Sequence, residues 1–127
     1  MIIGIGIDIC EISRMKKACE RNGFTARFFS KRENEEFAQR KYPPQSIAAA
    51  FAAKEAAAKA FGTGIRGFSM KDIELLHDSL GKPYVVLSGK AKEQMEAIGA
   101  DRIHVSITHT GNIAAAFIIL EGKEIPS

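Results

Sequence analysis

SIAAAFAAKEAAAKAF, residues 46–61, is the stretch that decides the fold. Alanine is the strongest helix former, so this composition predicts one long helix, which Gly62 ends. The charged residues of the helix are Lys54, Glu55 and Lys59. Because a helix that is apolar nearly all round is usually buried, we expect these charges to need partners or a ligand.

The residues before this helix predict a strand and two shorter helices. Residues 2–9 alternate isoleucine with glycine or aspartate, which is typical of a strand. Its glycine face lets another backbone or a ligand approach closely, and Asp8 stands at the end of this buried strand. Helices are expected at 13–22, capped by Ser13, and at 30–40, opened by a capping box of Ser30 and Glu33.

The residues after the alanine-rich helix predict the rest of a single domain. We expect strands at 72–77, 84–87, 102–108 and 113–120, and a helix at 88–98. This order of elements predicts an α+β fold with helices packed on a largely antiparallel sheet. The chain of 127 residues has the size of one domain, which we expect over residues 1–122, with a C-terminal tail at 123–127.

Composition narrows the class of protein. A content of 46% apolar and 26% charged residues is ordinary for a globular protein and argues against disorder. The apolar run at the N-terminus is too short to span a bilayer and lacks a basic leader, so we expect no membrane association. Cys10 and Cys19 form no C-x-x-C pair, which indicates reduced thiols and a cytoplasmic protein.

The charge distribution indicates an anionic partner. The formal net charge is +3, and residues 14–27 concentrate basic side chains around a single acid, Glu20. The basic side chains are those of Arg14, Lys16, Lys17, Arg21 and Arg27. Nucleic-acid binding usually adds exposed aromatic residues to such a patch, and this stretch contains only Phe24. We therefore expect a protein or small anion as the partner, and no nucleic acid.

Four ionisable residues are candidates for chemistry: Asp8, Glu55, Lys59 and His109. A buried carboxylate is costly unless it caps a helix, pairs with a base or binds a cation. Because Mg²⁺ typically takes one or two carboxylates together with phosphates and waters, Asp8 and Glu55 could bind it. Lys59 could contact a phosphate or transfer a proton. The hydroxyl groups near His109 could donate to a phosphate, and they belong to Ser106, Thr108 and Thr110.

Ordinary structural roles stay open for the same residues. Asp8 could pair with a base, His109 could be a structural histidine at a strand end, and Glu55 and Lys59 have the spacing of a helix-surface ion pair. A Ser-His-Asp hydrolase lacks its G-x-S-x-G elbow. The glycines at 62–64 do not complete a P-loop, and those at 4–6 lie within a strand, which excludes a dinucleotide fingerprint.

Several short motifs together resemble one family. They are GIGIDI at 4–9 with Glu11 and Arg14, FAAKEA at 51–56, KAFGTG at 59–64, GKP at 81–83 and HVSITHT at 104–110. In order and spacing the chain resembles the short bacterial-type 4′-phosphopantetheinyl transferases, the holo-(acyl-carrier-protein) synthases. The resemblance implies an α+β fold and homotrimers with active sites at subunit interfaces. It also implies transfer of phosphopantetheine from coenzyme A to a serine of apo acyl carrier protein, in support of fatty acid biosynthesis, with release of adenosine 3′,5′-bisphosphate.

The resemblance further implies roles for single residues. Asp8 and Glu55 match carboxylates that bind the metal, here Mg²⁺, and Lys59 matches the lysine one turn later, so these three are the expected catalytic residues. His109 matches the histidine near the coenzyme A diphosphate. The other residues expected to bind coenzyme A are Lys54, Phe61, Gly62, Thr63, Gly64, Ile65, Pro83 and Thr108.

The carrier protein is expected on the first helix, where Arg14, Lys17 and Arg21 match the family's basic residues. One position departs from the family pattern. Many members have an arginine just before the FAAKEA motif, and this chain has Ala50. The departure removes one basic contact to a substrate phosphate or to the carrier.

The expected mechanism depends mainly on electrostatics. Mg²⁺ would neutralise charge on the coenzyme A diphosphate, and Glu55 or a metal-bound water would take the proton of the carrier serine. The preferred carrier and the tolerance for acylated coenzyme A stay open. Two other functions also stay open: a noncatalytic basic binding module and a different Mg²⁺-dependent nucleotide enzyme, such as a small phosphohydrolase. The first would need neither Mg²⁺ nor coenzyme A, and the second would not need the basic helix.

Overall fold

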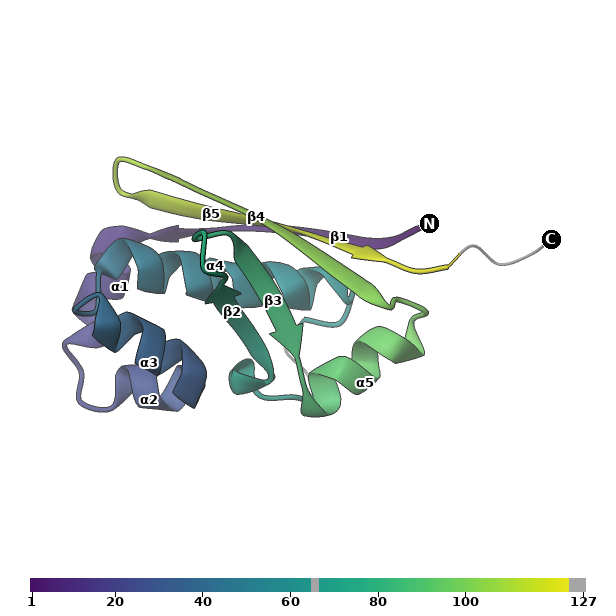
Figure 1. Cartoon of the computed structure of the whole chain (residues 1–127), viewed down its shortest axis with the longest axis horizontal. Helices are drawn as coiled ribbons and strands as arrows, with labels where there is room; N and C mark the ends of the chain where they lie inside the picture. Colours follow the sequence, from purple (N-terminus) through teal and green to yellow (C-terminus); the bar gives the residue numbers. More distant parts are fainter. Residues whose placement is uncertain (65–66, 124–127) are drawn as a thin grey trace.

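The structure, a computed structural model, describes residues 1–64 and 67–123 (Figure 1). Its strands form a three-stranded sheet and a separate hairpin, and every described pairing is antiparallel. The sheet has the order β1-β5-β4, with β1 at Ile2–Glu11, β4 at Arg102–Thr110 and β5 at Ile113–Glu121. The hairpin consists of β2 (Ile73–His77) and β3 (Pro83–Leu87). The predicted α+β class is confirmed, with two sheets in place of one.

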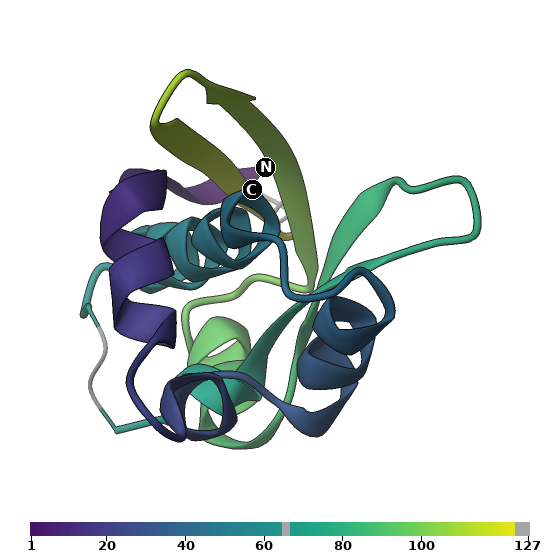
Figure 2. The ribbon, with the colours of Figure 1, turned by 90° about the vertical axis from the view of Figure 1, so that its left-hand side faces the viewer.

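Helix α4 (Pro44–Ala60) lies along one face of the three-stranded sheet, between this sheet and most of the other helices (Figures 1 and 2). Helix α1 (Ile12–Cys19) packs beside α4. The remaining helical elements are α2 (Phe24–Phe28), α3 (Lys31–Gln39), η1 (Met70–Asp72) and α5 (Gly89–Ala97). Figure 2 shows the β2–β3 hairpin reaching out to one side of the molecule.

The core surrounds α4. All the alanines of this helix are buried, and large apolar side chains at most 1% exposed pack with them: Phe29, Ile47, Ile73, Ile118 and Leu120. Within the described ranges, no helix combines the length and the apolar character needed to cross a bilayer. Cys10 and Cys19 are both free thiols.

The glycines of β1 allow α4 to approach its backbone. A Cβ atom added to Gly6 would overlap the carbonyl group of Ala56, and one added to Gly4 would overlap the carbonyl oxygen of Ala60. The other face of β1 points to solvent, with exposed fractions of 55, 59 and 62% at Ile5, Ile7 and Ile9. The expectation of a buried strand therefore holds only for the glycine face.

The predicted Ser13 cap is wrong. Helix α1 begins at Ile12 after Glu11, which makes no capping hydrogen bond through its side chain. Ser13 instead contacts the β4–β5 turn: its N–H donates to Oδ1 of Asn112 at 2.8 Å, and its Oγ accepts from Nδ2 of Asn112 at 2.8 Å. The predicted capping box of Ser30 and Glu33 is confirmed at the start of α3.

Candidate active site

Strand β1 and helix α4 bring Asp8 and Lys59 into contact. Nζ of Lys59 donates to Oδ1 of Asp8 at 2.8 Å and to the carbonyl oxygen of Ile7 at 3.1 Å. The side chains are 55% exposed for Lys59 and 21% exposed for Asp8. The hydrogen bond to Asp8 and the negative charge of this carboxylate raise the pKa of Lys59. The lysine is therefore firmly charged and remains open to solvent, although the helix that carries it is buried as predicted.

Glu55 lies one helical turn before Lys59 and is half-buried. Burial raises the pKa of its carboxyl group, the negative charge of Asp8 raises it further, and Lys59 opposes both effects. The charge of Asp8 therefore acts on Glu55 across the β1–α4 contact. Lys59 pairs with Asp8 in the structure, while the helix-surface pair that the sequence allowed with Glu55 is not formed.

Two carboxylates alone are an incomplete metal site. Among the described residues, no group of three or more His, Cys, Asp or Glu side chains is placed to hold a metal ion. Mg²⁺ does not need such a group, because it commonly binds one or two carboxylates and completes its octahedron with waters and substrate phosphates. The hard oxygen donors of Asp8 and Glu55 fit this pattern.

A groove of about 500 Å³ lies between β1, α1 and α4, and Cys10, whose thiol feels the charges of Asp8 and Glu55, is one of its lining residues. Its lining combines apolar side chains, including Met15, Phe24 and Phe51, with the basic side chains of Arg14 and Arg21. Lys17 joins Arg14 and Arg21 around a neighbouring hollow on α1. The three basic residues predicted for carrier binding therefore lie on one surface.

Sequence analysis missed several residues of this groove. Phe51 precedes Glu55 by four residues, and this spacing puts both on one side of a helix. The sequence could therefore have placed Phe51 near the site. Cys10 and Met15 could be found only once β1 and α1 were placed against α4. Burial raises the pKa of the Cys10 thiol, and the nearby charge of Asp8 raises it further.

The chain does not bring His109 to the carboxylates. His109 pairs with Ala114 on β5, and Ala114 pairs with Cys10 on β1, so a whole strand separates His109 from β1. Two strand spacings amount to roughly 10 Å. Thr108 precedes His109 on the same strand and therefore points to the other face of the sheet.

The predicted glycine segment follows α4 directly. The ring of Phe61 is buried in the core against Phe68, with 5.6 Å between the ring centroids. Gly62 and Gly64 have positive φ angles of 82° and 68°, and Oγ1 of Thr63 accepts from Nε2 of Gln94 at 3.1 Å. Ile65, also predicted to bind coenzyme A, lies outside the described residues. Pro83 begins β3, in the hairpin.

Lys54 differs from the other predicted cofactor residues. Its side chain is 0% exposed and pairs with Glu33, whose side chain is also 0% exposed. The three hydrogens of its ammonium group have acceptors within the protein, in Glu33, Met70 and Ile73. We therefore assign Lys54 to an internal network and leave it out of the proposed coenzyme A contacts. Ala50, at the position of the family's arginine, is 1% exposed.

The chain is similar to proteins of one known family. Residues 4–117 match the family described as the 4′-phosphopantetheinyl transferase superfamily. The chain is 52% identical over 122 residues to a holo-(acyl-carrier-protein) synthase of Clostridium novyi, covering 95% of this chain and 88% of the relative. It is 47% identical over 128 residues to one of Clostridium perfringens, covering 97% and 96%.

Solved structures show the same fold. The holo-(acyl-carrier-protein) synthase of Neisseria meningitidis superposes with a TM-score of 0.87 at 37% identity, over 95% of this chain and 99% of the other. The Bacillus anthracis structure, a complex with coenzyme A (3′,5′-ADP), gives a TM-score of 0.80 at 35% identity, over 97% and 99%. The chain belongs to the 4′-phosphopantetheinyl transferase superfamily, in which its matched relatives are holo-(acyl-carrier-protein) synthases.

Proposed function

We propose that this chain transfers the 4′-phosphopantetheine group from coenzyme A to a serine of apo acyl carrier protein. The observation that carries the proposal is the meeting of Asp8, Glu55 and Lys59 beside a groove with basic residues. In a member of this superfamily, such a site has the charges needed to bind a diphosphate and an acidic protein at once. Adenosine 3′,5′-bisphosphate would be the other product.

Asp8 and Glu55 are the proposed ligands of Mg²⁺. When bound there, the ion would supply positive charge to the diphosphate of coenzyme A as the bond to the leaving group breaks. Lys59 already holds Asp8 in place and is exposed, so its ammonium group can also reach an incoming phosphate oxygen. Phosphoryl transfer gains mostly from such positioning and electrostatic stabilisation.

Glu55 is the proposed acceptor of the proton that the carrier serine loses. Glu55 is half-buried and lies one helical turn after Phe51, which lines the groove, so both side chains are on the same side of α4. A carboxylate at this position could take the proton of a serine that enters from the groove. The oxygen freed of its proton would then attack the phosphorus.

Helix α1 is the proposed docking surface for the carrier. Arg14 and Lys17 are exposed on this helix, Arg21 is exposed two residues after its end, and acyl carrier proteins are acidic. Complementary charge of this kind mainly raises the association rate and makes it fall with salt. A charge reversal at Arg14, Arg14→Glu, is therefore expected to raise KM for the carrier and to leave KM for coenzyme A unchanged.

A homotrimer with shared active sites is the proposed assembly. Ile5, Ile7, Ile9 and Phe117 leave an apolar surface on the outer face of the three-stranded sheet, which a second copy could cover. The distance of His109 from Asp8 within one chain supports a site completed by a neighbouring subunit. The free thiols of Cys10 and Cys19 support the proposed cytoplasmic location.

The deciding experiment is intact-mass spectrometry of apo acyl carrier protein incubated with this protein, coenzyme A and Mg²⁺. We expect a mass gain of one phosphopantetheine group, lost with EDTA and lost in Asp8→Asn and Glu55→Gln variants. Glu35→Gln on the exposed side of α3 is the matched control and should transfer at the wild-type rate. Absence of any gain with folded wild-type protein and several carriers would contradict the proposal.

A further inference from the structure

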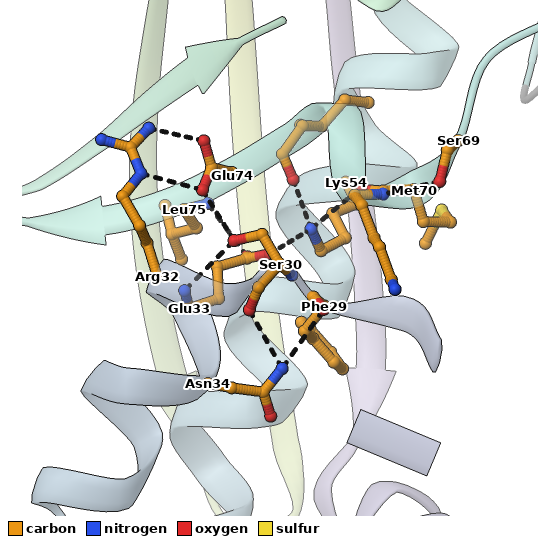
Figure 3. A network of polar contacts seen from close by, with 12 residues as sticks. Phe29, Ser30, Arg32, Glu33, Asn34, Lys54, Ser69, Met70, Glu74 and Leu75 are labelled. Carbon is orange, nitrogen blue, oxygen red and sulfur yellow. Dashed lines mark hydrogen bonds and ion pairs between the residues drawn. The ribbon is translucent and has the colours of Figure 1, made fainter. Parts of the chain in front are cut away.

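A second group of charges lies on another side of α4 and takes no part in the proposed chemistry (Figure 3). Nζ of Lys54 donates to Oε1 of Glu33, in the first turn of α3, at 2.6 Å. Burial lowers the pKa of Lys54 and raises that of Glu33, while their contact opposes both shifts. An apolar pair of similar volume often stabilises a protein as well as a buried ion pair does, so stability alone does not account for these residues.

The pair connects four elements by directional bonds. From α4, Lys54 also donates to the carbonyl oxygen of Met70 in η1, at 2.9 Å, and to that of Ile73 in β2. From α3, Glu33 accepts the N–H of Leu75 in β2 at 3.1 Å. In the part of the chain that the structure describes, no buried side-chain nitrogen or oxygen atom lacks a hydrogen-bond partner. Every buried polar side-chain atom of the network therefore has a partner.

An outer layer extends the network to the surface of the molecule. Glu74, the residue between the two β2 contacts, accepts from Oγ of Ser30 at 2.6 Å and from the guanidinium group of Arg32, where the shortest distance is 2.6 Å. The centroid of the Phe29 ring lies 5.2 Å from Nζ of Lys54, so an aromatic side chain also borders the network. Figure 3 shows these side chains converging from α3, α4 and β2.

Lys54 is the one charged residue among the buried residues of α4, which are otherwise Ile47 and alanines. On the β1 side, the backbone of α4 approaches Gly4 and Gly6 closely. On another side, the acceptors of the Lys54 ammonium group lie in α3, η1 and β2. Apolar contact has no preferred direction, whereas these hydrogen bonds set how α4 is rotated about its axis.

We propose that Lys54 and Glu33 are positioning residues that fix the rotation of α4 against α3 and β2 and so direct Glu55, the next residue, towards Asp8 on β1. The inference rests on the proposed function, in which these two carboxylates bind a divalent cation. Glu55 directly follows Lys54, so a slip of α4 by one residue would displace Glu55 by about 1.5 Å along the helix and about 100° around it. Either change separates the two carboxylates.

The test is the double variant Glu33→Gln/Lys54→Met, which removes the ion pair and keeps both side-chain volumes. The amide oxygen of the introduced glutamine can still accept a backbone N–H, so the variant should fold. Two properties are measured: the Kd for Mn²⁺, from its electron paramagnetic resonance signal, and the amide chemical shifts of β1. We expect a Kd at least about tenfold higher than in the wild type. We also expect shifted amide signals at Gly6 and Asp8, and an unchanged KM for the carrier protein.

Met95→Ala is the matched control, because it weakens the core in α5, away from the pair. If this control lowers Tm as much as the double variant does, it should still keep the wild-type Kd and β1 shifts. A wild-type Kd and unshifted β1 signals in the double variant would overturn the inference. If the wild type itself shows no Mn²⁺ binding that depends on Asp8, the proposed metal site fails instead, and the amide shifts alone decide the role of the pair.

Discussion

Helix α4 carries two lysine–carboxylate pairs that look alike and lie in different surroundings. Lys54 and Glu33 are 2.6 Å apart with both side chains 0% exposed, whereas Lys59 and Asp8 are 2.8 Å apart with side chains 55% and 21% exposed. The buried pair uses all its donors inside the protein. The open pair keeps donors and acceptors that a substrate or a cation can use.

The difference shows how one helix separates structure from chemistry. The Lys54–Glu33 pair is enclosed in the core, where breaking an ion pair costs much stability. The Lys59–Asp8 pair lies at the surface, where an ion pair contributes little to stability and its members can change partners easily. Each variant below alters the surroundings of one of the two pairs and tests whether the buried pair serves stability and the exposed pair serves catalysis.

Breaking the buried pair should have the largest effect. Lys54→Met leaves the buried carboxyl group of Glu33 without its partner, and we expect a loss of about 3–5 kcal/mol in the free energy of unfolding. Urea denaturation measures the loss. Glu33→Gln in the same background should recover part of it, because the unpaired carboxyl group is removed. A Lys54→Met variant as stable as the wild type would contradict the assignment.

Breaking the open pair should give the converse result. Lys59→Met removes a cation proposed to stabilise phosphate oxygens, and we expect kcat/KM for transfer to fall about 100-fold. The Tm should change little, because the side chain is mostly exposed. Steady-state kinetics and calorimetry on one preparation measure both quantities. A large fall in Tm with full activity would reverse the roles of the two lysines.

Adding a methyl group at the β1–α4 contact should lower both the stability of the protein and its affinity for divalent cations. Gly6→Ala forces the strand away from the Ala56 carbonyl, and overpacking of this kind costs about 1–3 kcal/mol. Because Asp8 lies two residues away, the Kd for divalent cations should rise as well. Gly4→Ala is the control: it makes a similar clash at Ala60, one turn farther from Glu55, and should affect stability more than cation binding.

The smallest effect should be the one on the pH dependence of stability, at the Arg32–Glu74 pair of the outer layer. The hydrogen bond from Arg32 lowers the pKa of Glu74 below its ordinary value of 4.5. Stability from this pair is therefore present above pH 4.5 and is lost as the pH falls through the lowered pKa. In thermal unfolding, Tm should fall less between about pH 6 and about pH 3 in Glu74→Gln than in the wild type. An equal fall of Tm in both proteins would contradict this prediction.

The sequence predicted the local features of this protein better than the distant ones. The helix of α4 and the capping box of Ser30 depend on neighbours within one turn, and both were predicted. The start of α1 depends on Asn112, which is 99 residues from Ser13, and was missed. The sequence allowed either Glu55 or Asp8 as the partner of Lys59, because the choice depends on how β1 packs against α4.

The role of Lys54 shows the same limit. Lys54 and Glu55 are adjacent in the sequence motif, which favoured a common site for both. Successive residues of a helix point about 100° apart, so the two side chains enter different surroundings. One meets the carboxylate of α3 in the core, and the other faces β1. A motif therefore identifies a helix turn, and the fold decides what each of its residues does.

The position of β5 has a consequence for how this protein is made. β5 follows the other described strands in the sequence and is also the central strand of its sheet, bonded to β1 on one side and β4 on the other. A nascent chain on the ribosome can form α4 early, but among the described strands β1 has no partner until β5 has been synthesised. The arrival of β5 thus closes the sheet over the helix, and a stop codon ahead of Ile113 would leave both β1 and β4 as unpaired edges.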